Sequence, residues 1–243
     1  MIALFTDFGL CGPYTGQVKA VLHREAPGLP VIDLFADAPL HDPRAAAYLL
    51  AAYAEWFAAG TVLLCVVDPG VGGPRVPLVV EADGRRFVGP DNGLFELVAR
   101  RAAAVQAWEI VWRPAVLAPS FHGRDLFAPV AARLAAGHDL AGALRPARLA
   151  ARPDWPDDLP EIVYIDRFGN AMTGLRAAAL PAGAQLRAAG RDLPRALSFP
   201  DLPRGAAFWY ENANGLLEIA VNQGRADAAL GLSIGGAVSI VAG

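Results

Sequence analysis

Two aspartates follow apolar strands in the same way, and they are the residues of this sequence best placed to do chemistry. Residues 61–67 form a continuous apolar run that ends in Asp68, and residues 2–5 run into Thr6 and Asp7. Open α/β sheets bind their ligands at the carboxyl ends of strands. We therefore expect Asp7 and Asp68 to line one pocket.

The segment after Asp68 is rich in glycine and ends in Arg75. Glycines let backbone N–H groups approach a ligand closely, but Asp68 and Arg75 can equally form an ion pair that only locks the loop. The sequence leaves both readings open. No helix follows the glycines and no Gly-Lys-Ser/Thr occurs, so neither a dinucleotide fingerprint nor a P-loop is present.

Asp7 is read either as a turn residue or as a carboxylate that accepts hydrogen bonds from a vicinal diol such as ribose. Among the four histidines, His122 is the best candidate because it lies in a polar loop at a helix start. We expect His23, His41 and His138 to be solvated.

Polar turns supply the remaining candidates. Asp91 and Asn92 are typical cap residues that can also help to line the pocket. Further along the chain, Asp166 and Asn170 end a strand in a turn, and residues 212–214 precede another strand as a hairpin signal. Each turn has an ordinary structural reading beside the functional one.

The elements that must position these residues alternate between strand and helix in the first part of the chain. This alternation predicts an α/β domain with a mainly parallel sheet flanked by helices. Strands are predicted at 2–6, 30–35, 61–67, 76–81, 86–89 and 107–112, and helices at 14–26, 43–58, 94–104, 125–136 and 138–144.

A proline- and aspartate-rich segment, 151–160, interrupts the pattern and reads as a linker. Beyond it, short strands and one short helix predict a smaller antiparallel β domain. We place the domains at 1–155 and 156–243. The strands are expected at 161–166, 171–175, 184–188, 206–211, 215–220 and 236–241, and the helix at 224–230.

Composition narrows the functional classes. The net charge is −3 with no basic stripe, which argues against a nucleic-acid surface. No apolar stretch is long enough to cross a bilayer, and the start of the chain lacks a basic n-region. Two cysteines cannot build a disulfide framework or a zinc cage. We therefore expect a cytoplasmic protein.

Taken in order, these motifs resemble one family over essentially the whole chain. Asp7, Asp68 with Arg75, the turn at 89–93, His122 and the C-terminal turns are arranged as in the SAM hydroxide adenosyltransferases (adenosine-forming SAM hydrolases), relatives of the fluorinating and chlorinating SAM enzymes. The resemblance implies an α/β domain, a β-barrel-like domain and a homotrimer. It also implies active sites between the N-terminal domain of one subunit and the C-terminal domain of its neighbour.

The resemblance also implies residue roles. Asp7 matches the aspartate that holds the ribose hydroxyls, and Asp68, Arg75 and His122 match a set associated with water. Asp166 and Asn170 match the pair near the methionine amino group and the adenine. Positions Asn212, Ala213 and Asn214 fall where the methionine carboxylate is contacted. Two residues depart from the family pattern: Ala213 stands where serine is usual and Gly174 where asparagine is frequent.

The implied reaction is attack of water on C5′ of S-adenosyl-L-methionine (SAM), giving adenosine and L-methionine. SAM is the substrate, and no cofactor or metal is expected. Arg75 is expected to hold the water oxygen, Asp68 to orient either Arg75 or the water, and His122 to accept or relay the proton. The alternatives are a SAM-dependent halogenase, a non-catalytic SAM or adenosine sensor, and a metal hydrolase built on Asp68, Asp91 and His122.

Overall fold

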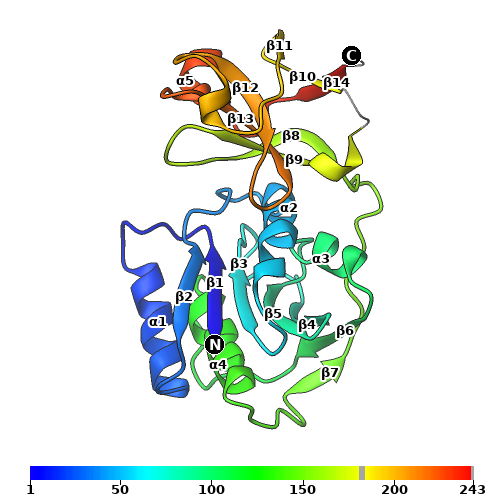
Figure 1. The fold of residues 1–243 in the computed structure, drawn as a ribbon. Coiled ribbons are helices and arrows are strands. Elements are labelled where there is room, and N and C mark those ends of the chain that lie inside the picture. The colour runs from blue at the N-terminus through cyan, green and yellow to red at the C-terminus, as the bar shows by residue number, and fades with distance from the viewer. Residues whose placement is uncertain (181–183, 242–243) are drawn as a thin grey trace. The chain divides into compact units, whose positions relative to one another are not determined.

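The computed structural model describes residues 1–180 and 184–241. It divides the chain into two compact units, Met1–Arg152 and Pro153–Gly243, where the sequence placed the boundary near 155. Each unit has its own hydrophobic core, and Figure 1 shows the helices and strands that form each unit. None of the helices in the described ranges combines the length and apolar character needed to span a membrane.

A seven-stranded sheet organises the N-terminal unit, with the strand order β2-β1-β3-β5-β4-β6-β7. The central strands β1 and β3 are buried along their whole length, as the continuous apolar runs predict. The strands are β1 (Ile2–Thr6), β2 (Val31–Phe35), β3 (Val62–Val66), β4 (Pro77–Ala82), β5 (Arg85–Pro90), β6 (Val105–Ile110) and β7 (Leu144–Pro146).

The sheet is mixed rather than mainly parallel. Strands β2, β1, β3 and β5 run parallel, whereas β4, β6 and β7 join by antiparallel pairing. A two-residue turn, Asp83-Gly84, connects β4 to β5, and both residues have positive φ (48° and 77°). Such a turn can only produce an antiparallel hairpin, so the parallel character is confined to the half of the sheet that carries Asp7 and Asp68.

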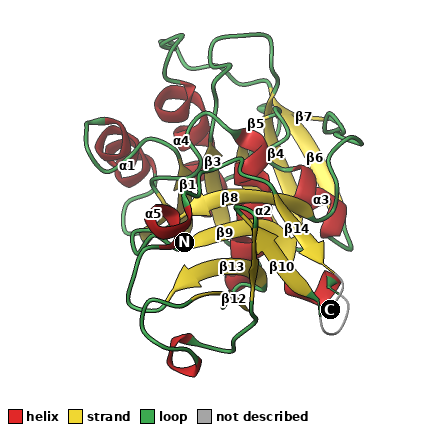
Figure 2. Cartoon of the chain, turned by 90° about the horizontal axis from the view of Figure 1, so that it is seen from above, coloured by secondary structure: helices red, strands yellow, loops and turns green. Residues whose placement is uncertain are grey.

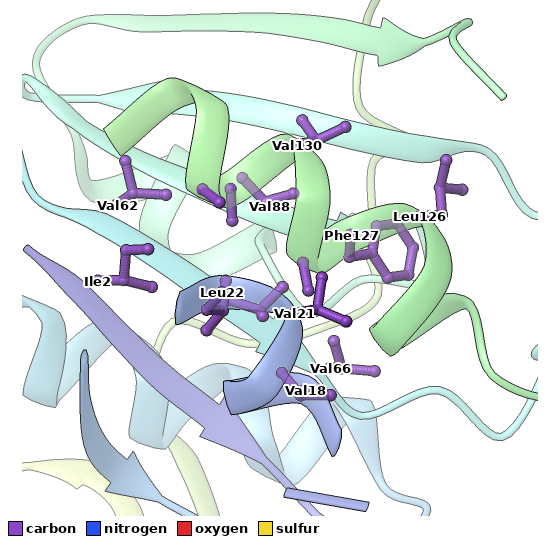
Figure 3. Close-up of a cluster of buried hydrophobic side chains, with 14 of the residues drawn as sticks. Ile2, Val18, Val21, Leu22, Val62, Val66, Val88, Leu126, Phe127 and Val130 are labelled. Atoms are coloured by element: carbon purple, nitrogen blue, oxygen red, sulfur yellow. The ribbon is translucent and has the colours of Figure 1, made fainter. Parts of the chain in front are cut away.

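Helices cover both faces of this sheet. On one face, α1 and α4 pack together over a core that contains Ile2, Val62 and Val88 (Figure 3). Helix α2 packs against α3, and Asp42 caps α2 by accepting a hydrogen bond from the Ala45 N–H at 3.0 Å. The helical segments are α1 (Tyr14–Glu25), α2 (Pro43–Tyr53), the 3₁₀ turn Ala54–Trp56, α3 (Glu96–Arg101), the π turn Gly123–Phe127 and α4 (Ala128–Ala135).

The helix predicted at 138–144 is wrong. Gly137 and Gly142 have φ of 75° and 80°, which breaks a helix directly before this segment and within it. The chain turns instead and forms the short edge strand β7, which the sequence analysis missed. Its Pro146 is tolerated because β7 lies at the edge of the sheet.

The C-terminal unit contains two antiparallel sheets, with the orders β12-β13-β9-β8 and β11-β10-β14 (Figure 2). A bridge between Glu161 and Ala237 links them. Strand β11 was not predicted; it follows β10 through the tight turn Ala189-Gly190. The elements are β8 (Leu159–Ile165), β9 (Ala171–Arg176), β10 (Gln185–Ala188), β11 (Arg191–Leu193), β12 (Ala207–Glu211), β13 (Leu216–Val221), α5 (Ala226–Leu230), β14 (Val238–Val241) and the 3₁₀ turns Ala177–Ala179 and Phe199–Asp201.

Candidate active site

A cavity of ≈ 430 Å³ lies at the carboxyl ends of β1 and β3 in the N-terminal unit. The structure brings Asp7, Asp68 and His122 together on its wall, at the place where the sequence predicts a shared pocket. Its remaining lining residues are Phe8, Tyr14, Leu40, His41, Val66, Pro69, Val71, Ser120, Phe121 and Gly123.

Asp68 and Arg75 form a buried ion pair beside this cavity. Their side chains are only 4% and 10% exposed, respectively. Arg75 Nε donates to Oδ1 and Oδ2 of Asp68 at 3.0 and 2.9 Å, and Arg75 Nη2 lies 2.5 Å from Oδ2. The pair therefore locks the glycine-rich loop, and Asp68 also lines the cavity. The structural reading is confirmed, and the functional reading stays a prediction.

Arg75 also contacts His122, since Nη2 lies 3.0 Å from His122 Nδ1. A guanidinium has donors and no acceptor, so Nδ1 must accept. The neutral ring then carries its proton on Nε2. His122 therefore offers an N–H donor, and not a basic nitrogen, to a ligand in the cavity that it lines.

The electrostatic surroundings favour this neutral form of His122. Burial lowers the pKa of His122, and the Arg75 guanidinium lowers it further, against an opposing effect of Asp68. For Asp7, burial raises the pKa, against a hydrogen bond that Oδ2 accepts from the backbone N–H of His41 at 3.0 Å. The partly desolvated Asp7 carboxylate is thus ready to accept hydrogen bonds from a ligand.

Hydrogen bonds from neighbouring loops hold the end of β3. Asn92 Nδ2 donates to the carbonyl oxygen of Val67 at 2.8 Å, directly before Asp68, while Asn92 Oδ1 accepts from the Leu94 N–H. Asn92 therefore has the predicted cap role and also positions the loop that carries Asp68. Gly89 is required here because a Cβ would lie 2.0 Å from the Cys65 carbonyl oxygen.

The His122 loop is fixed by the pair Arg124–Asp125. Arg124 Nε and Nη2 donate to the two oxygens of Asp125 at 2.6 and 2.9 Å, and Asp125 Oδ2 accepts from the Ala118 N–H at 2.9 Å. Gly123 begins a π turn, a feature often found at functional sites. A Cβ on Gly123 would lie 2.9 Å from the Phe8 ring, so this position needs glycine.

Sequence reasoning missed the aromatic wall of the cavity. Phe8 and Tyr14 each pack edge to face against Phe121, with ring centroids 5.8 and 5.5 Å apart, and lie tilted to each other at 6.4 Å. His41 is exposed, as the sequence predicts, and it also lines the cavity. The backbone φ of His41 is 58°, and in this conformation the His41 N–H donates to Asp7. The residue type alone does not predict this conformation.

Asp91 does not join this site. Its carboxylate accepts from the Ala150 N–H, 3.2 Å from each oxygen, and it is not among the residues that line the cavity. The metal site proposed for Asp68, Asp91 and His122 is therefore not assembled. Over residues 1–180 and 184–241, no group of three His, Cys, Asp or Glu side chains is placed to bind a metal ion.

A second cavity, ≈ 980 Å³ in volume, lies in the C-terminal unit. Asp166 and Asn170 both line it. The Asn170 backbone N–H donates to Asp166 Oδ1 at 2.8 Å, which closes the turn between β8 and β9. The other lining residues are Phe168, Phe199, Pro200, Tyr210, Glu218, Val221, Asn222, Gln223, Gly224 and Arg225. Of these, Glu218 and the aromatic residues were not predicted.

The turn at Asn212, Ala213 and Asn214 does not line this cavity. Asn212 uses its side chain within the hairpin: Oδ1 accepts from the N–H groups of Asn214 and Leu216, and Nδ2 donates to Glu218. Gly174, the other departure from the family pattern, has a local reason. A Cβ there would lie 2.7 Å from Leu159 Cβ on the neighbouring strand.

Comparison with known proteins agrees with this geometry. The family model for the SAM hydroxide adenosyltransferase N-terminal domain matches residues 2–143, and the model for the C-terminal domain of the same family matches residues 160–239. The chain belongs to this family. The resemblance inferred from the ordered motifs is thus confirmed.

Curated relatives carry one name, (R)-S-adenosyl-L-methionine hydrolase. The Thermus thermophilus protein is 42% identical and the Salinispora arenicola protein 37% identical, over 96% and 100% of this chain and 96% and 98% of their own lengths. A crystal structure of an uncharacterized conserved protein from Thermotoga maritima matches with a TM-score of 0.89 at 30% identity, over 99% of this chain and 100% of that one. One of a conserved hypothetical protein from Thermus thermophilus gives a TM-score of 0.78 at 38% identity, with 99% of each chain covered.

Proposed function

We propose that this protein hydrolyses SAM to adenosine and L-methionine by attack of water on C5′ of the ribose. The name shared by its relatives supports the substrate. The observation that carries the proposal is that Asp68 and His122 line the same cavity as Asp7, while Arg75 contacts both of them from behind the wall.

The difficult part of this reaction is activation of the nucleophile. A C5′–O bond forms as the C5′–S bond breaks, and the sulfur takes the bonding electron pair and leaves as a neutral thioether. The leaving group needs no proton. Water is a weak nucleophile with a pKa of about 15.7, so the site must orient it and accept a proton as the bond forms.

We assign the roles of Asp68, Arg75 and His122 differently from those expected from the sequence. Because Nδ1 of His122 accepts from Arg75, the Nε2–H is left to donate to the oxygen of the attacking water. The Asp68 carboxylate is then the acceptor of the triad that faces the cavity, and we assign it the proton. Arg75 acts through Asp68 and His122 and is a positioning residue, since its Nε and Nη2 already donate hydrogen bonds to Asp68.

Substrate binding in this half of the site falls to Asp7, whose carboxylate suits the two ribose hydroxyls. The printed name of the relatives specifies the R form, which refers to the sulfonium, a pyramidal stereocentre. We extend this preference to the present chain. Incubation with each sulfonium epimer separately, followed by chromatography, tests it.

The second cavity, with Asp166 and Asn170, supplies the other half of the site in this proposal. The homotrimer expected from the family would combine the N-terminal unit of one subunit with the C-terminal unit of its neighbour. Co-expression of Asp68→Asn with Asn170→Ala tests this arrangement. Random mixing of subunits would restore about one quarter of the sites, whereas sites within single chains would stay inactive.

Product analysis tests the reaction itself. The protein is incubated with SAM, with and without 100-fold excess chloride, and the nucleosides are separated. We expect adenosine and methionine in equal amounts under both conditions. A 5′-chloronucleoside would indicate a halogenase, and binding without any product would indicate a sensor. A location in the cytoplasm remains a prediction.

A further inference from the structure

His41 has a backbone conformation that is uncommon for a residue with a side chain. In the part of the chain that the structure describes, four residues other than glycine have a positive φ: His41, Asp83, Ala189 and Gln223. The last three lie in two-residue turns between paired antiparallel residues, where a positive φ is needed. His41, with φ of 58°, lies in no such pair, so its conformation must have another cause.

The segment that leads to His41 is hydrogen-bonded to the end of β1, next to Asp7. The Ala38 N–H donates to the carbonyl oxygen of Thr6, the residue before Asp7, at 3.0 Å. The His41 N–H then donates to the Asp7 carboxylate itself, with 3.0 Å between the nitrogen and Oδ2. The backbone that supplies this donor is therefore attached to the strand that supplies the acceptor.

A tight turn directs the His41 N–H toward Asp7. The Asp42 N–H donates to the Pro39 carbonyl oxygen at 3.2 Å, so His41 is the third residue of a four-residue turn. Glycine or asparagine is usual at this place when φ is positive. The next residue, Asp42, caps α2. His41 thus holds a glycine-like conformation between two fixed elements, β1 and α2.

The bond from His41 determines which part of the Asp7 carboxylate is open to a ligand. No other residue within the described ranges donates a hydrogen bond to this carboxylate. An ionised carboxylate offers about four acceptor sites. Oδ1 and the second lone pair of Oδ2 therefore remain for a ligand in the cavity that both residues line. Without the His41 N–H, the Asp7 side chain would have to be ordered by the ligand, which costs affinity.

We propose that His41 is a positioning residue whose backbone N–H, aimed by the turn, fixes the Asp7 carboxylate in the orientation that meets the ribose diol. The inference rests on the proposed function, because that function assigns the ribose to Asp7. The donor is a backbone group, so the imidazole is not required. Any residue that accepts a positive φ should support the contact, glycine most readily and a β-branched residue least.

Isothermal titration calorimetry of the full chain with adenosine and 2′,3′-dideoxyadenosine tests the proposal. A hydrogen bond to a charged group changes affinity by a factor of roughly 10 to 150, and we expect the wild type to prefer adenosine by a factor in this range. His41→Val should lower this preference at least about threefold, because a β-branched residue disfavours a positive φ. Its affinity for the dideoxynucleoside should stay within about twofold of the wild type, since that ligand lacks the diol.

His41→Gly separates the backbone from the imidazole. It removes the side chain but adopts a positive φ readily, so its preference should stay within about twofold of the wild type. If His41→Val does not fold, His41→Ala decides, because any Cβ disfavours the left-handed conformation. The preference of His41→Ala should then lie at least about twofold below that of His41→Gly.

Ala189→Val is the matched control. It places valine at another positive φ, 49°, in the exposed turn between β10 and β11 of the C-terminal unit. This variant should keep the wild-type preference. An unchanged preference in His41→Val, an equal loss in His41→Gly, or an equal loss in Ala189→Val would each overturn the role of the His41 backbone.

Failure of this inference and failure of the proposed function give different results, because nucleoside binding is measured without turnover. If SAM is not hydrolysed but the preference falls in His41→Val and not in His41→Gly, the reaction is wrong and the role of His41 stands. If SAM is hydrolysed but both variants keep the preference, the role of His41 is wrong. Equal wild-type affinity for the two nucleosides would remove Asp7 as the ribose ligand and the role of His41 with it.

Discussion

Replacing Arg75 with methionine should release His122 to take up a proton at higher pH than in the wild type. The bond from Arg75 Nη2 to Nδ1, 3.0 Å long, exists only while the ring is neutral. A hydrogen bond with a charged partner contributes about 1.5–3 kcal/mol, and the lower end applies because His122 is only partly buried. Loss of this hydrogen bond in Arg75→Met therefore lowers the ratio of neutral to protonated His122 at a given pH roughly tenfold.

Loss of the Arg75 charge acts in the same direction, since Arg75 lowers the pKa of His122 while Asp68 raises it. Histidine C–H signals followed by NMR over pH 4–9 measure the effect without requiring activity. The chain has four histidines, so His122→Gln assigns the signal. Arg75→Lys keeps the charge without the planar fork and separates the hydrogen bond from the charge.

The control for this titration is Arg24→Met, which removes an exposed arginine on α1 that pairs with Glu25. It should leave the His122 titration unchanged. If His122 titrates at the same pH in Arg75→Met as in the wild type, Arg75 does not set the protonation of the ring. The assignment of Nε2–H as the donor would then be lost.

Three further predictions concern single positions. Asp68→Asn should lower turnover about 10²–10⁴-fold while SAM still binds by calorimetry; a loss below tenfold would remove Asp68 as the proton acceptor. Asp7→Asn should weaken SAM binding yet raise the thermal midpoint at pH 7. Burial raises the pKa of the Asp7 carboxyl in the folded protein, so the unfolded chain loses this proton at lower pH than the folded chain. Ionisation of Asp7 at neutral pH therefore costs folding stability, and asparagine removes that cost. The gain in thermal midpoint should vanish near pH 3, and a gain that persists there would contradict this cause. Gly174→Asn should lower the free energy of unfolding in urea by about 1–3 kcal/mol because its Cβ would lie 3.0 Å from the Leu159 carbonyl oxygen; unchanged stability would show that the strands separate easily.

The half of the fold that carries Asp7 and Asp68 could be predicted from sequence because its signals are local. Continuous apolar runs mark the buried strands β1 and β3, and the polar residue that follows each run marks a strand end. The helix at 138–144 failed because Gly142 adopts a positive φ that composition alone does not specify. The mixed sheet was also missed, since Asp83-Gly84 was not recognised as a hairpin turn.

Some residues of the candidate site could likewise be predicted from the sequence, and others could not. Asp68 and His122 were identified by type and position, but their hydrogen-bond roles depend on which nitrogen of His122 faces Arg75. Glu218 was overlooked because a single glutamate within the strand Leu216–Val221 is typical of a solvent-facing position. Only its partners Tyr210 and Asn212, which come from the adjacent strand and turn, show that it is buried.

The source of the oxygen in the nucleoside product tests most directly whether water attacks C5′ of SAM. The protein is incubated with SAM in water enriched in ¹⁸O, and adenosine is analysed by mass spectrometry with fragmentation of the ribose. Attack of water on C5′ predicts one ¹⁸O atom in the 5′-hydroxyl, formed in the wild type and strongly reduced in Asp68→Asn. Unlabelled adenosine, or label formed at the same rate in both proteins, would contradict the account.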